Sequence, residues 1–508
     1  MTFELCRESP TQLRLENPYG VPVRVFANDS VAIDRSATDE LGSLLELAGT
    51  VEQIHRAQPD FFEDRQAAVA EVAVSPDFHK GKGVPIGTSL LTRGFIVPQA
   101  IGNDVNCGMR LHATDLTEDQ VRRVLPDLER RIRHVFFEGG REIPMRRVQR
   151  ESLLQEGLAG VLQTHARGEQ KGLWSWYQAA RQEQDLQRVI GGGGLKSAIS
   201  PILNDYLGED RLTYDDQIGS IGGGNHFVEL QVVRKVLEGP TAFAWGLRPG
   251  RVVVMIHTGC VKLGYPTGSK FADVVREIYP KTISHPQNGV FVLPEGERFA
   301  TQWKAFWNSY GNAVNFAFAN RLMLSLMMLR ALTEVVGETS YPLVYDAGHN
   351  VVGPEDIDGQ RCYLHRKGAT PARGFQEMEQ TEFAYYGEPV LIPGSMGASS
   401  FILAGMGNRQ SLFSASHGAG RSLSRGHALK VDEQRFRQFL KEFHVVTPID
   451  PARADVRSRP DILRKWEEEL KTEAPFAYKE IGPVIDTQVA AATVRGVAEV
   501  KPILTVKG

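Results

Sequence analysis

Side chains that bind transition metals recur in glycine-containing stretches of this 508-residue sequence. They are Asp104 and Cys107 in AIGNDVNCGMR, His226 in IGGGNHFVE, His257 in MIHTG and His349 in YDAGHN. A carboxylate, a thiolate and imidazoles form a borderline-soft ligand set, which suits zinc, manganese, iron or cobalt better than calcium or magnesium. Taken alone, each histidine is more often a hydrogen-bonded core or loop residue, and the cysteine a small buried hydrophobe. Their joint recurrence beside glycines favours a metal centre.

The spacing of these residues distinguishes between two kinds of metal site. A structural zinc site usually shows paired Cys-x-x-Cys spacing and a closed shell of four ligands. Here the ligands are single and dispersed, and only Asp104 and Cys107 are close, three residues apart between Gly102 and Gly108. The sequence therefore predicts a catalytic metal centre with open coordination positions, in which one cysteine can bridge two metals.

A further histidine, His417, lies in the segment SHGAGR beside Gly418 and Gly420. Glycines let backbone N–H groups approach a phosphate closely, and Arg421 can balance its charge. His417 can then be a ligand, a base or a nucleophile that forms a covalent phosphoramidate, although the segment can equally be a simple turn. Other glycine-rich stretches match neither the Walker nor the Rossmann order, so an ordinary P-loop NTPase or NAD enzyme is not expected.

The charge balance and the cysteine content limit which partners and which compartment are expected. With 58 Lys and Arg against 61 Asp and Glu, the net charge of −3 provides no global attraction for a polyanion, so an RNA partner needs a local basic groove. The candidate basic spots are Lys80 with Lys82 and Arg366 with Lys367, although solvated surface charge is the commoner role for any one of them. Four widely spaced cysteines favour a reducing cytosol over a disulfide framework, so we expect a cytoplasmic location.

Short β-branched runs lead into the polar residues described above. RVVVMIH ends at His257, YPLVYDAGH ends at His349, and EPVLIPGS ends in a glycine turn, so each is predicted to be a strand that delivers polar groups to a loop. Residues 306–329 come closest to a membrane span, but Arg321 and several asparagines interrupt them. We predict a buried helix there.

The remaining elements are mixed. Thr117 and Gln120 form a capping-box pattern at the start of an amphipathic helix that we expect to bend at Pro126. Residues 117–187 are predicted to form a helical segment, whereas residues 478–508 show strand-like alternation. Since no repeat or clear linker divides the chain, we predict a single α+β (mixed α/β) catalytic domain over the whole sequence, residues 1–508, with helical insertions.

A series of motifs occurs in order from about residue 76 to the C-terminus. They are PDFHKGKGVPIG, PQAIGNDVNCGMR, GGGNHFVE, YDAGHN, HRKGATPA, PGSMGASS, SHGAGR and YKEI. In this order they strongly resemble the RtcB family of GTP-dependent RNA ligases, also called tRNA-splicing ligases. The resemblance implies a distinctive mixed α/β fold and an enzyme that joins an RNA 3′-phosphate or 2′,3′-cyclic phosphate to a 5′-hydroxyl in RNA repair or tRNA splicing.

The resemblance also implies roles for particular residues. Two Mn²⁺ ions would be held by Asp104, Cys107, His226, His257 and His349, with Cys107 as the bridge. GTP would guanylylate His417, water would open any cyclic phosphate, GMP would move to the RNA 3′-phosphate, and the 5′-hydroxyl would expel GMP. The implied GTP-binding residues are Asn225, His226, Phe227, Val228, Glu229, His349, Asn350, Pro393, Gly394, Ser395, Met396, Ser400, His417, Gly418, Ala419, Gly420 and Lys479.

The sequence departs from the family pattern at two places, as expected of a divergent paralogue. Val261 follows His257 where an arginine is expected near the RNA end, and Lys82 stands where an aromatic residue is usual. Two alternatives therefore remain open. One is a metal-dependent phosphodiesterase that opens the cyclic phosphate but seals poorly, and the other is a non-catalytic protein that binds RNA ends.

Overall fold

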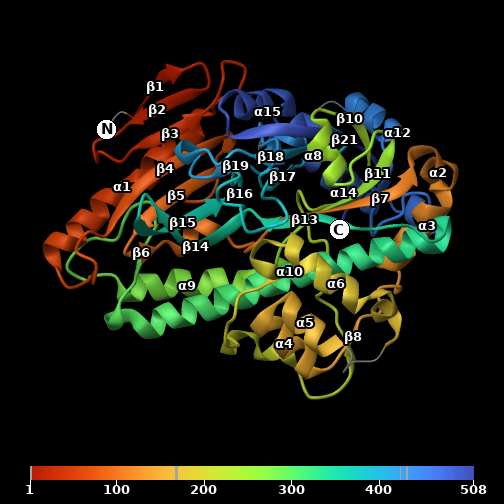
Figure 1. The fold of residues 1–508 in the computed structure, drawn as a ribbon, viewed down its shortest axis with the longest axis horizontal. Helices are drawn as coiled ribbons and strands as arrows, with labels where there is room; N and C mark the ends of the chain where they lie inside the picture. The colour runs from red at the N-terminus through yellow and green to blue at the C-terminus, as the bar shows by residue number, and fades with distance from the viewer. Residues whose placement is uncertain (1–2, 166–169, 424, 431–432) are drawn as a thin grey trace.

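Two β-sheets form the centre of the molecule (Figure 1), which we describe from a computed structural model covering the chain except residues 1–2, 166–169, 424 and 431–432. The first sheet has the strand order β1-β2-β3-β4-β5-β15-β14, and its pairs are antiparallel except for β3 with β4. Its strands are β1 Glu4–Ser9, β2 Gln12–Glu16, β3 Val23–Phe26, β4 Ala68–His79, β5 Ile86–Arg93, β14 Asn350–Ile357 and β15 Gln360–Lys367. Helices lie around both sheets, which confirms the predicted α+β class.

The second sheet has the order β13-β7-β11-β10-β21-β18-β17, and β20 (Val445–Val446) also pairs with β21. Its strands are β7 Gly108–Thr117, β10 Phe227–Val236, β11 Arg251–Thr258, β13 Leu343–Gly348, β17 Pro389–Ile392, β18 Ser400–Gly405 and β21 Val494–Val506. Strands β11, β13 and β17 confirm the three predicted strands. Large apolar side chains from this sheet are buried on both faces, as expected where helices and further strands cover it.

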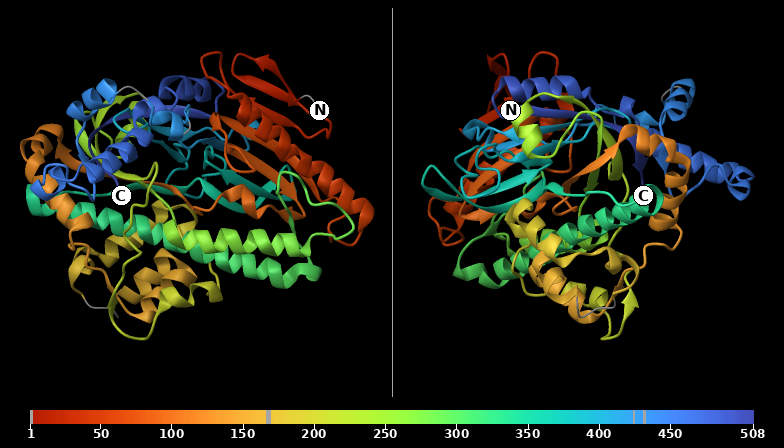
Figure 2. Two further views of the ribbon diagram at one scale, coloured as in Figure 1. Left: turned by 180° about the vertical axis from the view of Figure 1, so that it is seen from behind. Right: turned by 45° about the vertical axis from the view of Figure 1, so that its right-hand side comes forward.

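Helix α10 (Ala300–Val336) runs beneath both sheets and beside α9 (Gly264–Ile278), as both views in Figure 2 show. It is long and apolar enough to cross a membrane by length and composition, but 83% of its most apolar window is buried inside the protein. The asparagines that interrupt it bond to neighbouring loops: Asn315 accepts from Leu195 N–H, and Asn320 accepts from Ser220 N–H. The predicted buried helix is therefore confirmed.

The helical segment is broken into several short helices, with α4 and α5 on the side of α10 away from the sheets (Figure 1). They are α2 Glu118–Arg123, α3 Leu125–Phe137, α4 Arg147–Glu156, α5 Leu158–Thr164 and α6 Ala179–Asp185. The capping box of Thr117 with Gln120 is present. The prediction of one bent helix was wrong, because Pro126 lies in the first turn of α3, where its missing N–H is harmless, and the chain breaks at Val124.

A second difference lies near the C-terminus. Residues 481–490 form helix α15 (Ile481–Ala490), and only the part beyond them forms strand β21. The predicted strand-like alternation over the whole stretch was therefore wrong in its first half. Val484 and Ile485 are buried by α15, whereas strand β21 pairs with both β10 and β18 in the second sheet. Tertiary packing decided the conformation of a segment whose local pattern was ambiguous.

Candidate active site

The metal-binding side chains meet because four neighbouring strands of the second sheet begin or end at the same edge. Cys107 and His226 directly precede β7 and β10, while His257 and His349 lie at the ends of β11 and β13. These strands are antiparallel neighbours, with Phe227 opposite His257 and Gly348 opposite Gly108. The starts of two strands therefore adjoin the ends of the other two, and ligands far apart in sequence converge.

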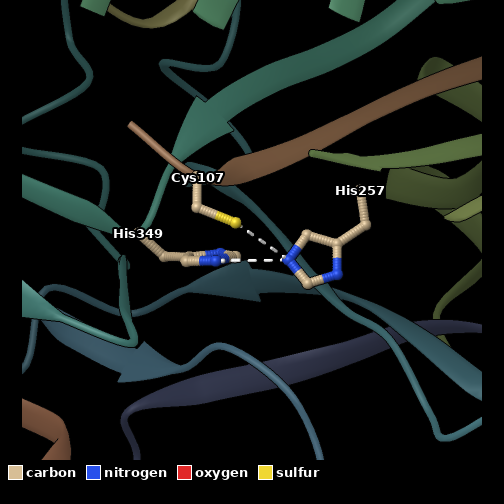
Figure 3. A group of neighbouring side chains, drawn as sticks. All are labelled: Cys107, His257 and His349. Carbon is tan, nitrogen blue, oxygen red and sulfur yellow. Dashed lines mark hydrogen bonds between the residues drawn. The ribbon is translucent and has the colours of Figure 1, made fainter. Parts of the chain in front are cut away.

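The five candidate ligands form two groups that share Cys107. Cys107 with His257 and His349 is one group, shown in Figure 3, and Asp104, Cys107 and His226 form the other. Cys107 Sγ lies 3.3 Å from His226 Nε2 and 3.4 Å from His257 Nε2. His257 Nε2 lies 3.3 Å from His349 Nε2, and His226 Nε2 lies 2.9 Å from Asp104 Oδ2. Donor atoms therefore point toward one another from all sides.

Neighbouring groups orient the ligand atoms. His226 Nδ1 contacts the Ile221 carbonyl oxygen at 3.0 Å, so this nitrogen carries the proton and Nε2 presents its lone pair. Asp104 Oδ1 accepts from Val261 N–H at 3.1 Å and from the Cys260 thiol at 3.5 Å. Asp104 Oδ2 is buried and faces His226 Nε2 at 2.9 Å. This buried carboxylate oxygen, together with the ring nitrogens and the thiol that converge on it, fits a bound cation.

The protonation states also fit a cation. Burial lowers the pKa of His257 and of His349 well below the ordinary value, and both imidazoles are neutral at physiological pH. Burial alone would raise the pKa of Asp104, but the charge and hydrogen bond of His226 outweigh it and bring the pKa to about 2. Burial and the Asp104 carboxylate raise the pKa of the Cys107 thiol, so a metal ion has to displace its proton on binding.

A buried charge network holds the ligand loops against helix α10. Arg321 Nε donates to Asp346 Oδ1 at 2.8 Å, and Arg110 Nη1 donates to Asp346 Oδ2 at 3.0 Å. Arg321 Nη1 also donates to the carbonyls of Asn106 and Thr258, the neighbours of a cysteine and a histidine ligand. All three charged side chains are fully buried, and removing one partner of such a pair generally costs about 3–5 kcal/mol. Arg321, which interrupts the apolar helix in sequence, therefore positions the metal-binding loops.

His417 lies beside this centre and is oriented by a buried carboxylate. Its Nδ1 is 2.6 Å from Asp77 Oδ2, and its ring centroid is 4.9 Å from that of His349. Asp77 is completely buried and also accepts from Ser75 Oγ at 2.5 Å. Burial alone would raise the pKa of Asp77, but the His417 charge and hydrogen bond lower it to about 2. The ionised carboxylate keeps a proton of His417 on Nδ1, so Nε2 is the ring nitrogen that remains available for other contacts.

The glycine segment after His417 packs tightly on the strand that carries Asp77. Gly420 has a φ of 74°, and a Cβ at this position would collide with the Asp77 carbonyl. Only glycine accommodates both the left-handed backbone and this close approach. The segment is thereby held beside His417 and lines a cavity.

That cavity has a volume of about 170 Å³ and connects His417 with His257. Eleven of the residues implied for GTP binding line it: Asn225, Phe227, Glu229, Pro393, Gly394, Ser395, Met396, His417, Gly418, Ala419 and Gly420. Arg421, Glu473, Tyr478, Thr505 and Lys507 line it as well. The cavity thus offers backbone amides, a carboxylate and cations next to the metal-binding groups.

Comparison with known proteins decides the family. The model of the family described as "tRNA-splicing ligase RtcB" matches residues 63–508. The chain belongs to the RtcB family. It is 31% identical to the tRNA-splicing ligase RtcB of Thermococcus kodakarensis, over 96% of this chain and 95% of that protein. It is 32% identical to the RNA-splicing ligase RtcB of Mycobacterium tuberculosis, over 85% of this chain and 96% of that protein.

Several residues implied by the RtcB resemblance lie outside the cavity lining. His226 and His349 belong to the metal-binding groups, and Asn350 Nδ2 donates to the Asp104 carbonyl at 3.1 Å. The Ser400 hydroxyl accepts from Gly394 N–H at 3.1 Å and so supports the PGSM loop. Val228 is fully buried, with Ile256 and Val506 as its register partners in β11 and β21.

Lys479 is the clearest difference between the implied site and the observed cavity. Its ammonium donates to the carbonyls of Pro76 and Phe78, so it anchors the strand that carries Asp77. The lysine that lines the cavity is Lys507, on the segment after β21. Lys507 was not predicted from the sequence, because a lysine next to a C-terminal glycine has no local pattern. Asp77 was not predicted either, although this carboxylate lies two residues before His79 within a motif of the RtcB resemblance.

Proposed function

We propose that this chain is a GTP- and Mn²⁺-dependent RNA ligase that joins RNA 3′-phosphate or 2′,3′-cyclic phosphate ends to 5′-hydroxyl ends. The observation that carries the proposal is the position of His417, oriented by Asp77 next to two ligand groups that share Cys107. A nucleophilic imidazole beside a two-metal centre is suited to nucleotidyl transfer. RNA repair or tRNA splicing in the cytoplasm is the corresponding cellular role.

The ligand groups would hold two Mn²⁺ ions, with Cys107 as the bridge, and bound metal would supply neutralisation of phosphate charge. His417 Nε2 attacks the α-phosphorus of GTP, forming a phosphorus–nitrogen bond while pyrophosphate leaves. Asp77 holds the Nδ1 proton and stabilises the positive charge that develops on the ring. The RNA 3′-phosphate then takes GMP from His417, and the 5′-hydroxyl attacks this activated end and releases GMP.

Guanine recognition is assigned to the end of the cavity that contains Glu229. Its carboxylate accepts from Thr505 Oγ1 at 2.6 Å and from Gln231 Nε2 at 2.6 Å, which fixes its direction. A carboxylate can accept hydrogen bonds from the N1–H and amino group of guanine, whereas adenine offers no matching pair. Burial raises the pKa of Glu229, and the charge of Lys507, which lines the same cavity, opposes this rise, so we add Lys507 to the nucleotide site.

The whole chain is proposed to act as one catalytic unit over residues 1–508. His417 follows strand β19 (Ser414–Ser416), whereas its partner Asp77 belongs to the first sheet and the metal ligands to the second. The groups of the site therefore come from both sheets and from the segment after β19. Separate folding of either part would leave the site incomplete.

The proposal is tested by mixing one RNA bearing a 3′-phosphate or a 2′,3′-cyclic phosphate with a second RNA bearing a 5′-hydroxyl, in the presence of GTP and Mn²⁺. We expect a joined product that ATP does not support. Opening of a cyclic phosphate without joining would instead support the phosphodiesterase alternative, which the presence of Val261 in place of an arginine favours. RNA binding without any metal-dependent product would support the non-catalytic alternative.

Nucleotide binding is expected to depend on the ionisation of Glu229. Burial raises the pKa of Glu229 to about 7, although the hydrogen bonds from Thr505 and Gln231 act to lower it. Because only the ionised form accepts two hydrogen bonds from guanine, affinity for a non-hydrolysable GTP analogue should fall about tenfold from pH 8 to pH 6. Calorimetric titration of wild type and Glu229→Gln at both pH values measures this effect. Titration of the phosphates and of metal ligands is common to both proteins, so an equal pH dependence in the variant would contradict the assignment.

A further inference from the structure

A second, larger hollow adjoins the nucleotide cavity on the other side of His79. It has a volume of about 740 Å³ and shares His79, Ile86 and Arg421 with the first cavity. Its walls are the loop of residues 79–83, the loop of residues 98–103, residues 288–290 and one side of helix α9. We call this hollow the basic groove. In Figure 1, α9 lies below the first sheet.

The groove is strongly positive although the chain carries a net charge of −3. Lys80, Lys82, Arg276, Lys367 and Arg421 line it, and the part of the chain that the structure describes contributes no carboxylate to its walls. Arg421 is paired with a glutamate, but Lys80, Lys82 and Arg276 are exposed and form no ion pair with any residue whose position is described. Unpaired cations gathered in one concave surface attract a polyanion.

The lysines are presented by a rigid loop. The Glu40 carboxylate accepts from Gly81 N–H at 2.5 Å and from Gly83 N–H at 2.8 Å. From the other side, the buried ammonium of Lys367 donates to the carbonyl of Lys82 at 3.3 Å and of Val84 at 2.7 Å. Two independent anchors thus fix the backbone and leave the side chains of Lys80 and Lys82 directed to solvent. Pre-organised cations lose little entropy when they bind phosphates.

Helix α9 contributes an aromatic platform and a smooth wall. Tyr265 is 65% exposed, which is unusual for a tyrosine beside a cavity. Gly268, Ser269 and Ala272 follow on the same side of the helix, so a flat ligand can approach the backbone closely. Exposed aromatic rings interleaved with cations are the arrangement with which proteins hold single-stranded nucleic acid, because every base has a face to stack.

We propose that the basic groove binds the single-stranded RNA that flanks the end being joined, with Lys80, Lys82 and Arg276 on its phosphates and Tyr265 against a base. This inference rests on the proposed function. Continuity with the His417 cavity selects RNA over other polyanions, because the reacting end must lie at His417 and the strand behind it has to leave by an open path. The chemistry of the groove requires a phosphodiester backbone with unstacked bases.

The experiment measures binding of a labelled single-stranded RNA of about 12 nucleotides by fluorescence anisotropy, without GTP, over a range of salt concentrations. Lys82→Gln and Arg276→Gln should each weaken binding and reduce the slope of log affinity against log salt by about 0.7. Tyr265→Ala should weaken binding roughly fivefold to a hundredfold. Lys270→Glu is the matched control, since this exposed lysine lies on α9 but does not line the groove.

Wild-type affinity in all three groove variants, or an equal loss in Lys270→Glu, would overturn the proposal. A blunt RNA duplex is expected to bind weakly and to respond little to Tyr265→Ala; an equal response would also overturn it. Formation of the GMP adduct is measured on the same wild-type preparation. RNA binding without an adduct would refute the proposed function but leave the groove assignment intact. An adduct without RNA binding would refute the groove assignment but leave the proposed nucleotidyl transfer intact.

Discussion

Replacing His417 by Ala is expected to abolish covalent labelling of the protein by GTP, because His417 lines the nucleotide cavity and its Nδ1 faces the buried Asp77 carboxylate, whereas His79 in the same cavity is oriented by a backbone carbonyl. Wild type incubated with α-labelled GTP and Mn²⁺ should carry GMP through denaturing electrophoresis. The label should be lost in acid and retained in alkali, as expected for a phosphorus–nitrogen bond. Loss of RNA joining should accompany loss of the label.

Two further variants test whether His417 itself carries the label and whether Asp77 assists it. Asp77→Asn keeps the nucleophile and the shape of the pair but removes the ionised acceptor, so labelling should persist at a rate reduced by up to about 10⁴-fold. His79→Ala removes another histidine of the cavity, whose ring centroid lies 6.4 Å from that of His417, and the label should stay on the peptide containing His417. Full labelling of the His417→Ala protein would refute the assignment of His417 as the nucleophile. An unlabelled wild type with metal bound and ATP also tested would favour the phosphodiesterase or RNA-end-binding alternative.

Replacing Cys107 by Ala is expected to eliminate binding of the metal pair, because Cys107 is the residue shared by both ligand groups. Metal content after equilibration with Mn²⁺ and gel filtration should fall from two ions to one or none. Thermal unfolding provides a second readout that does not depend on catalysis. Mn²⁺ at about 100 times its dissociation constant should stabilise wild type by about 2.7 kcal/mol and the variant far less.

The matched control for this prediction is Cys362→Ala. Cys362 is also a buried free cysteine, but it lies on β15 in an apolar cluster away from the metal-binding groups. Its replacement should affect stability modestly and leave the metal content unchanged. Full nucleotide transfer and two bound ions in Cys107→Ala would refute the bridging role. Zn²⁺ should be compared with Mn²⁺, since a site with cysteine and histidine ligands generally binds zinc more tightly.

Local features were predictable from the sequence because their physical causes are local. The strands ending at His257 and His349 follow from β-branched runs, and the Thr117 capping box follows from two side chains three residues apart. The ligand set was predictable from residue type alone, since few combinations of carboxylate, thiolate and imidazole recur beside glycines. The break at Val124 and helix α15 were not predictable from the sequence, because each depends on what the segment packs against.

The sequence by itself determined the class of fold, the family and the candidate ligands, since these follow from strand patterns, residue types and the order of motifs along the chain. Only the tertiary structure decided which groups act together. The Asp77 carboxylate and His417 are 340 residues apart, and their contact exists because strand β4 of the first sheet packs beside strand β19, which leads into His417. The same holds for Lys507 in the nucleotide site and for the basic groove. Long-range contacts of this kind depend on how elements pair and pack, which no local pattern encodes.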